Sequence, residues 1–119
     1  MVRINKNNIE FTKGDTCTLR LELVNEKNEP VDLTGATGLL TVKEYLNDTT
    51  FAEKVSLPFF NHPEADPALG IVYFKFVPAN TQNLKIKKYY YDIQINRGGD
   101  IYTVREGDIY LTKEVKFNV

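Results

Sequence analysis

The segment that most limits what this chain can fold into runs from Lys88 to Thr112, where apolar and polar residues alternate. In its first half, every second position carries an apolar or aromatic side chain: Tyr89, Tyr91, Ile93 and Ile95. The positions between them are Tyr90, Asp92, Gln94 and Asn96. Successive side chains of a β-strand point to opposite faces of the sheet. The alternation therefore predicts a strand with one face on a core and the other toward water.

The second half of this segment repeats the letters GDIY, first from Gly99 and again from Gly107. Glycine reaches positive φ without a steric clash, and aspartate hydrogen-bonds to its own backbone in turns. Each Gly-Asp pair therefore predicts a turn. The whole segment then predicts a meander of three antiparallel strands.

The rest of the chain carries further short extended runs separated by turn-forming residues. The ordered part is expected to begin with Ile9 and Phe11. Further strands are expected at 16–24, 36–45, 51–57, 69–77 and 115–119, with one helical turn within 78–84. Many short strands without a long helical pattern are typical of a Greek-key sandwich or barrel. We favour the sandwich: an all-β, antiparallel fold with a single domain over residues 1–119, in which residues 1–8 are a flexible lead-in.

The phases of the predicted strands indicate which residues fill the core. Six are expected to be largely buried and packed together: Leu19, Leu21, Val72, Phe74, Tyr91 and Ile93. Leu40 and Val42 are the expected inward pair of the strand at 36–45. Cys17 shares its phase with neighbouring leucines, which predicts a buried, slowly reacting thiol. A catalytic cysteine would need a histidine partner, and the only histidine, His62, lies in a distant loop.

Composition argues against several classes of protein. Fifteen basic residues against sixteen acidic ones give a net charge of -1, without the basic patch that nucleic-acid binding requires. A single cysteine excludes an internal disulfide. The N-terminal residues lack the apolar core of a signal peptide, and no run is long enough to cross a membrane. We expect no nucleic-acid or membrane partner, and a chain that stays in the cytoplasm until it is assembled.

Two groups of residues resemble catalytic or metal sites but are better explained as loops and turns. His62, Glu64 and Asp66 offer metal-ligand atoms, yet they lie in a proline-rich loop without a rigid frame. Asp100 and Asp108 could be read as the two catalytic acids of a glycosidase. Each follows a glycine, however, and Gly-Asp pairs are explained by turns. The expectation is a protein that is not an enzyme, with no catalytic residue, no metal ligand and no cofactor.

Exposed aromatic residues are the most suggestive surface feature. Tyr90, Tyr102 and Tyr110 are the meander residues expected to face water, and such rings are used at protein interfaces and in sugar stacking. The alternation of the last residues continues to Phe117 and Val119. We expect this last strand, together with the tyrosines, to dock on another subunit. The alternative is that Phe117 and Val119 complete the domain's own sheet, and that the tyrosines reflect only strand propensity.

The order of motifs along the chain resembles a known family. The motifs are GDTCTLRLEL, PVDLTGAT, GIVYFKF, PANTQNL, YYYDIQI and IYTVREGDIYLT, followed by a Lys-Glu-Val ending. Their order is similar to that in the small Ig-like β-sandwich domains of structural proteins of tailed phages and prophages, especially the N-terminal domain of upper baseplate proteins of phages that infect Gram-positive bacteria. The resemblance covers about Phe11 to Val115.

This resemblance implies an Ig-like fold and a non-enzymatic virion structural protein of a tail, baseplate or head-tail junction. The family has no catalytic residues to transfer. Upper baseplate proteins continue into helical and receptor-adaptor regions, so an accessory role is expected for the sequence ending at Val119. The implied partners are other virion proteins or copies of the same chain, and the implied location is the host cytoplasm and then the virion. The alternative is a carbohydrate-binding module, although such modules usually present tryptophan, which is absent here.

Overall fold

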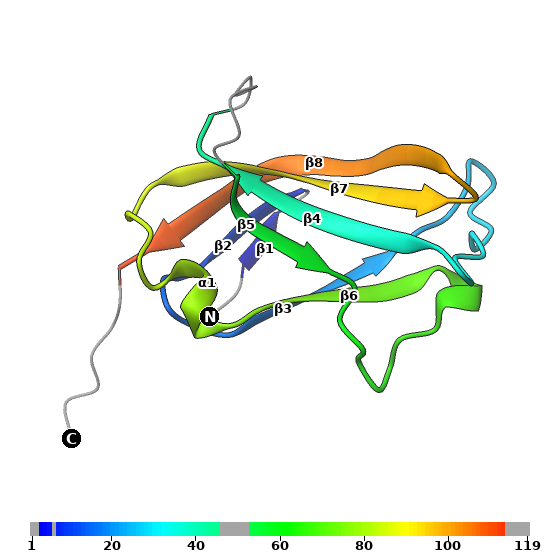
Figure 1. Ribbon diagram of the computed structural model, residues 1–119, viewed down its shortest axis with the longest axis horizontal. Helices are drawn as coiled ribbons and strands as arrows, with labels where there is room; N and C mark the ends of the chain where they lie inside the picture. Colours follow the sequence, from blue (N-terminus) through cyan, green and yellow to red (C-terminus); the bar gives the residue numbers. More distant parts are fainter. Residues whose placement is uncertain (1–2, 6, 46–52, 114–119) are drawn as a thin grey trace.

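Two β-sheets pack against one another in the computed structural model, which describes residues 3–5, 7–45 and 53–113 (Figure 1). The first sheet has the strand order β1 (Arg3–Asn5), β2 (Asn8–Thr12), β8 (Asp100–Thr112), β7 (Lys88–Arg97), β4 (Thr37–Lys43) and β5 (Glu53–Pro58). The second sheet pairs β3 (Cys17–Glu22) with β6 (Ile71–Phe76). A 3₁₀ turn, η1 (Pro67–Leu69), precedes β6, and a one-turn helix, α1 (Pro78–Thr81), follows it.

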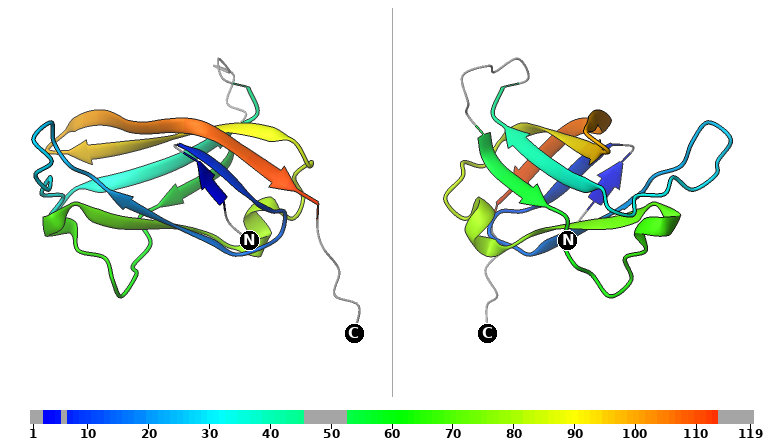
Figure 2. Two further views of the ribbon diagram at one scale, coloured as in Figure 1. Left: turned by 180° about the vertical axis from the view of Figure 1, so that it is seen from behind. Right: turned by 45° about the vertical axis from the view of Figure 1, so that its right-hand side comes forward.

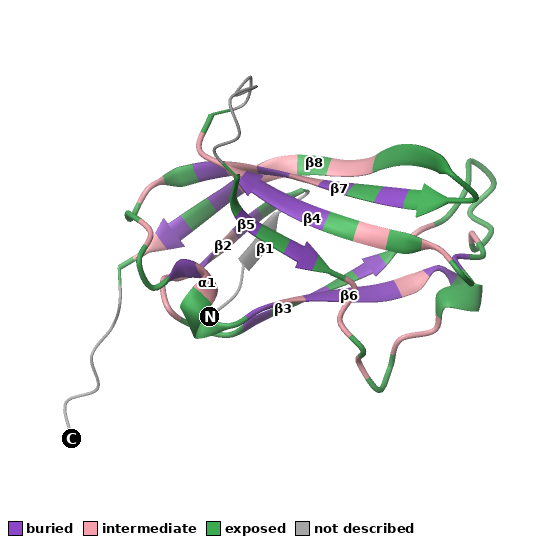
Figure 3. Ribbon diagram, viewed as in Figure 1, coloured by how far each residue is buried: buried purple, intermediate pink, exposed green. Residues whose placement is uncertain are grey.

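The core lies between the two sheets, and the alternating pattern of the strands fills it. All six residues predicted to form it are buried, and they belong to one hydrophobic cluster. In the second sheet, Leu19 pairs with Phe74 and Leu21 pairs with Val72, so the inward-facing residues of the two strands lie side by side on the core face. Leu40 and Val42 are also buried, as predicted. Figure 3 shows these buried segments on the strands of both sheets.

The segment 88–112 forms two strands, so the prediction of a three-stranded meander is wrong. The first turn is present: Gly98 and Gly99 both have positive φ, 61° and 90°, and they join β7 to β8 as a two-residue hairpin turn. The second Gly-Asp pair lies inside β8. There, a Cβ on Gly107 would overlap the carbonyl oxygen of Asn7 and the ring of Tyr91. Gly107 is thus a site of close approach between backbones, rather than a turn.

A β-bulge at Val104 shifts the phase of β8. Ile93 pairs with Arg105 and Gln94 pairs with Thr103, which leaves Val104 as the extra residue. Paired residues of neighbouring strands share a face of the sheet, and an extra residue reverses the alternation beyond it. After the bulge, the odd-numbered residues of β8, such as Ile109, face the core. Before the bulge, the even-numbered residues, such as Tyr102, face that side instead.

The first sheet is not entirely antiparallel, which corrects the expected topology. β2 runs parallel to β8, with Ile9 opposite Ile109 and Phe11 opposite Leu111. Both members of each pair are buried, so the core contact fixes this register. Every other pairing of the described strands is antiparallel. β1 lies within residues 1–8, which the sequence had indicated as a flexible lead-in; it pairs with β2 from Arg3 to Asn5.

Some predicted elements are only partly covered by the described residues. Of the strand predicted at 51–57, the described part is β5, which begins at Glu53. The strand predicted at 115–119, with Phe117 and Val119, lies outside the described residues. Within the described residues the chain is an all-β domain of two packed sheets.

Candidate protein-binding surfaces

The outer face of the first sheet, turned away from the core, brings Tyr90 and Tyr110 together. Tyr90 pairs with Asp108 and Lys88 pairs with Tyr110, so the two tyrosines are diagonal neighbours on adjacent strands. The Lys88 ammonium lies 5.0 Å from the centre of the Tyr90 ring, a cation–π distance. Tyr110 is exposed, whereas Tyr90 is half-buried. Two of the tyrosines predicted as interface residues thus share one surface.

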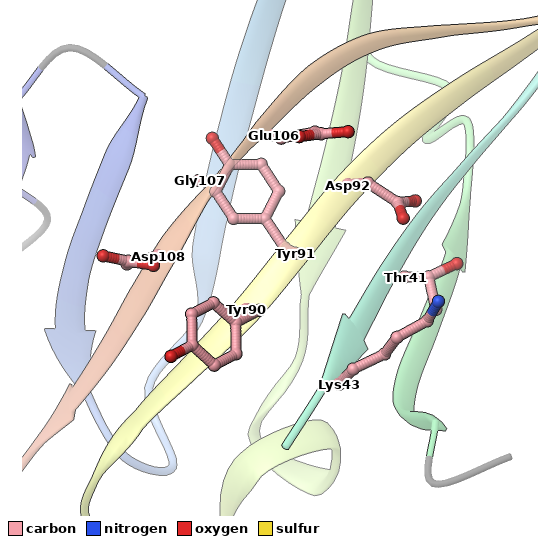
Figure 4. A pocket seen from close by; sticks show the side chains of 8 residues that line it. All are labelled: Thr41, Lys43, Tyr90, Tyr91, Asp92, Glu106, Gly107 and Asp108. Atoms are coloured by element: carbon pink, nitrogen blue, oxygen red, sulfur yellow. The ribbon is translucent and has the colours of Figure 1, made fainter. Parts of the chain in front are cut away.

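A shallow depression beside Tyr90, the outer recess, has a volume of about 350 Å³. It is lined by Thr41, Lys43, Tyr90, Tyr91, Asp92, Glu106, Gly107 and Asp108 (Figure 4). Asp92 and Glu106 lie directly opposite one another on β7 and β8. Burial raises the pKa of the Asp92 carboxyl above its ordinary value, Lys43 opposes this shift, and Glu106 adds to it. The side chains of the outer recess suit a cationic or hydroxyl-bearing group.

Tyr102 lies on the opposite face of the same sheet. It pairs with Ile95, which is buried in the core, because the bulge at Val104 has reversed the alternation of β8. Without the extra residue, Tyr102 would share the outer face with Tyr110. The three tyrosines therefore do not form one surface.

Tyr102 lines a second hollow, the inner slot, with a volume of about 720 Å³. Its lining residues are Leu23, Val24, Glu26, Val31, Leu33, Ile95, Arg97, Tyr102, Thr103 and Val104. The slot lies between the start of β8, the end of β7 and the segment that follows β3. Six of the ten lining residues are aliphatic, and the other four are Tyr102, Thr103, Glu26 and Arg97. Such a lining suits apolar side chains entering between the sheets.

The outer face also carries an apolar residue that the sequence analysis did not identify. Ile101 is 63% exposed, and with the exposed Leu39 it lines a hollow of about 320 Å³. The alternation of β8 predicts that Ile101 points inward, in phase with Ile109, and the bulge turns it outward. The residues on either side of Val104, Thr103 and Arg105, are neither glycine nor proline and give no signal of the irregularity.

The residues considered for chemistry lie in different parts of the two sheets: Cys17 is buried on β3, and Asp100 and Asp108 lie on β8. Burial raises the pKa of the Cys17 thiol to about 11, so the thiol stays protonated and unreactive near neutral pH. Asp100 and Asp108 lie on one strand at eight positions' separation, which corresponds to about 26 Å at about 3.3 Å per residue. The carboxyl groups of a glycosidase pair are only about 5–9.5 Å apart. These two acids therefore cannot act on one glycosidic bond.

The loop that contains His62 is ordered by local contacts. The His62 ring stacks on Tyr73 at a centroid distance of 3.9 Å, and its Nδ1 accepts a hydrogen bond of 3.0 Å from the backbone N–H of Glu64. Asp66 precedes η1, and its backbone is paired with Ile71. Among the described residues, no three His, Cys, Asp or Glu side chains are grouped so as to hold a metal ion.

No protein-family model matches this chain, and a search of curated proteins finds no match. No helix in the described part of the chain is long and apolar enough to span a membrane. The remaining interface candidates, Phe117 and Val119, lie outside the described residues.

Proposed function

We propose that this chain is a virion structural protein of a tailed phage or prophage, which acts by binding other virion proteins or copies of itself and not by catalysis. It would belong to a tail, a baseplate or a head-tail junction. It would be made in the host cytoplasm and then carried in the particle. Neither nucleic acid, nor a membrane, nor a cofactor is part of this role.

The order of strands supports the Ig-like part of this proposal. In Ig domains, one sheet contains strands G, F and C, and in variable-type domains also C′, while strands B and E belong to the other sheet. Here β8, β7, β4 and β5 are consecutive in the first sheet, and β3 pairs with β6 in the second. Assigning β3 to strand B and β6 to strand E makes the two orders agree. This agreement supports a Greek-key connection of the Ig type.

The observation that carries the proposed function is the exposure of large apolar side chains on both faces of the β7–β8 hairpin. Ile101 and Tyr102 are 63% and 53% exposed, and Tyr110 is 40% exposed. Tyrosine is enriched in the contact regions of protein interfaces, and on the outer face the exposed Ile101 shares a hollow with the exposed Leu39. A surface of this composition favours protein binding.

Particle incorporation tests the proposal. The gene is deleted from the phage or prophage that encodes it, and tagged protein is supplied from a plasmid while particles form. We expect the tagged protein to remain with particles through density-gradient purification, and the deletion to reduce particle yield or adsorption. A tagged protein that is absent from purified particles, together with a deletion that leaves particles unchanged, would refute the virion role.

The outer recess favours carbohydrate binding as the second candidate, because it combines the Tyr90 ring with the carboxylates of Asp92, Glu106 and Asp108. Aromatic rings and carboxylates are groups that contact sugar faces and hydroxyls. A glycan array separates the two candidates. Binding to a cell-wall glycan that is lost in Tyr90→Ala but kept in Tyr102→Ala would favour the second candidate over the first.

A further inference from the structure

Among the described strands, none pairs with the outer edge of β8 in the half next to the hairpin turn, and this part of β8 is called the free edge below. β2 pairs with β8 only from Ile109 to Thr112, and the N–H of Asp108 is met by the side chain of Asn8 at 3.2 Å. From Asp100 to Gly107, no described strand pairs with the side of β8 that faces away from β7. Figure 2 shows β1 and β2 beside the C-terminal half of β8 only. Unpaired backbone groups along such an edge are a template for another strand.

The inner slot opens directly beside this edge. Tyr102, Thr103 and Val104 belong to both the free edge and the slot. Across the slot lies Val24, which is 41% exposed. A strand added to β8 would therefore place every second side chain in an apolar hollow of about 720 Å³, and the others in water. The bulge at Val104 creates this arrangement, because it turns Tyr102 toward the slot.

Residues 114–119 have the pattern that such an added strand needs. Val115, Phe117 and Val119 alternate with Glu114, Lys116 and Asn118. In an extended conformation, the three apolar side chains share one face. Glu114, Lys116 and Asn118 then share the opposite face, which is turned toward water.

These six residues cannot reach the slot of their own chain. β8 ends at Thr112, and Thr103 lies about 30 Å back along the strand at about 3.3 Å per residue. Six residues span at most about 22 Å when fully extended. The segment would have to return along β8 before it could begin to pair, and its length does not allow this.

We propose that the free edge of β8 and the inner slot receive residues 114–119 of a second copy of this chain. The added strand completes the sheet of the receiving copy, and its apolar side chains fill the slot. Each copy then both donates a segment and accepts one, so the contact is head-to-tail and builds rings or open filaments. This inference rests on the assembly role proposed above and specifies the surface that would perform it.

Two complementary variants test the inference in solution with the whole chain. Tyr102→Lys places a charge in the slot, and Phe117→Asp places one in the donated face. Each is expected to weaken self-association, measured by sedimentation velocity across a concentration series, by about tenfold or more, as loss of an interface anchor does. Ile86→Lys is the matched control, because Ile86 is 52% exposed, close to the 53% of Tyr102, and lies between α1 and β7, outside the residues that line the slot. It should associate as the unchanged protein does.

Mixing the two variants gives the decisive result. A copy with a blocked slot can still donate its segment, and a copy with a damaged segment can still accept one. An equimolar mixture of Tyr102→Lys and Phe117→Asp should therefore form a 1:1 dimer that does not grow further. Far-UV circular dichroism checks that each variant is folded, and Val24→Lys, on the opposite wall of the slot, replaces Tyr102→Lys if it is not.

The inference is overturned if the unchanged protein is monomeric at several hundred micromolar, or if Phe117→Asp associates normally. It is also overturned if the mixture stays monomeric, because a symmetric contact between two β8 edges would not be restored by mixing. The solution test does not depend on particle incorporation. A protein that enters particles yet fails this test would retain the proposed function and lose only the head-to-tail contact.

Discussion

Replacing Gly107 by alanine tests a close approach between two backbone segments of the first sheet. The new Cβ would overlap the carbonyl oxygen of Asn7 and the ring of Tyr91. The Tyr91 hydroxyl donates a hydrogen bond to the same Asn7 carbonyl. To accommodate the methyl group, the chain at Asn7 must therefore move away from β8, or the Tyr91 ring must rotate. Either movement breaks the hydrogen bond.

The expected loss of stability follows from these two effects. Adding a methyl group to a closely packed site costs about 1–3 kcal/mol. Losing the hydrogen bond costs about 0.5–1.5 kcal/mol more. We expect Gly107→Ala to lower the free energy of unfolding by about 2–4 kcal/mol in urea titrations. For a domain of this length, the midpoint of thermal unfolding would fall by about 8–16 °C, at about 4 °C per kcal/mol.

A double-mutant cycle with Tyr91→Phe shows whether the two effects share one contact. Tyr91→Phe alone removes the hydroxyl and should cost about 1 kcal/mol, but in the Gly107→Ala background its cost should fall toward zero. Glu106→Ala, an exposed neighbour on β8, is the control and should change stability by about 0.5 kcal/mol or less. An unchanged unfolding midpoint for Gly107→Ala, or costs that simply add, would refute this account of the glycine.

Three further changes test the core and the surface charges. Phe74 is fully buried, so Phe74→Ala should lower the free energy of unfolding by about 3–5 kcal/mol, and a change below about 1 kcal/mol would contradict the strand phases. Cys17 should react with a thiol reagent far more slowly in the native protein than in urea, and equal rates would show that it is exposed. Burial raises the pKa of this thiol to about 11, so its contribution to stability is fully present below the ordinary thiol pKa and is lost as pH rises from that value through about 11. Hydrogen bonding to Lys87 lowers the pKa of Glu44, so this pair stabilises the fold above the ordinary glutamate pKa and loses that contribution as pH falls through the lowered pKa. Lys87→Met should therefore raise the Glu44 pKa in an NMR titration. An unchanged pKa would show that the 3.0 Å contact between Lys87 and Glu44 does not persist in solution.

The core was predictable because its signal is local. Leu19, Leu21 and Phe74 lie on strands in which apolar residues alternate, and whichever strand pairs with them, the apolar face must be covered. The same holds for Tyr91 and Ile93 on β7. For such strands, burial depends on the sequence of a few neighbouring residues, and the structure agrees with the prediction.

The candidate binding surfaces were not predictable in the same way, because they depend on contacts between distant segments. The letters Gly-Asp are typical of a turn, yet Gly107 is required by the approach of Asn7, a residue far away in the chain. The position of the bulge at Val104 depends on how β8 meets β7. An alternation continued across that position places Tyr102 with Tyr110, on the wrong face. The single extra residue, Val104, therefore determines whether Tyr102 lies on the inner or the outer face of the sheet.

The parallel pairing of β2 with β8 also bears on how the protein is made. Asn8 and Asp108 are hydrogen-bonded at a separation of 100 residues, so β2 can pair with β8 only when almost all residues up to the end of β8 have left the ribosome. At about 5–20 residues per second, translation takes about 5–20 s to cover that distance. During this delay Ile9 and Phe11, which are buried in the finished fold, are exposed to solvent and to other nascent chains. Slow codons or scarce chaperones should therefore lower the yield of this protein through aggregation before folding, even where its native stability is unchanged.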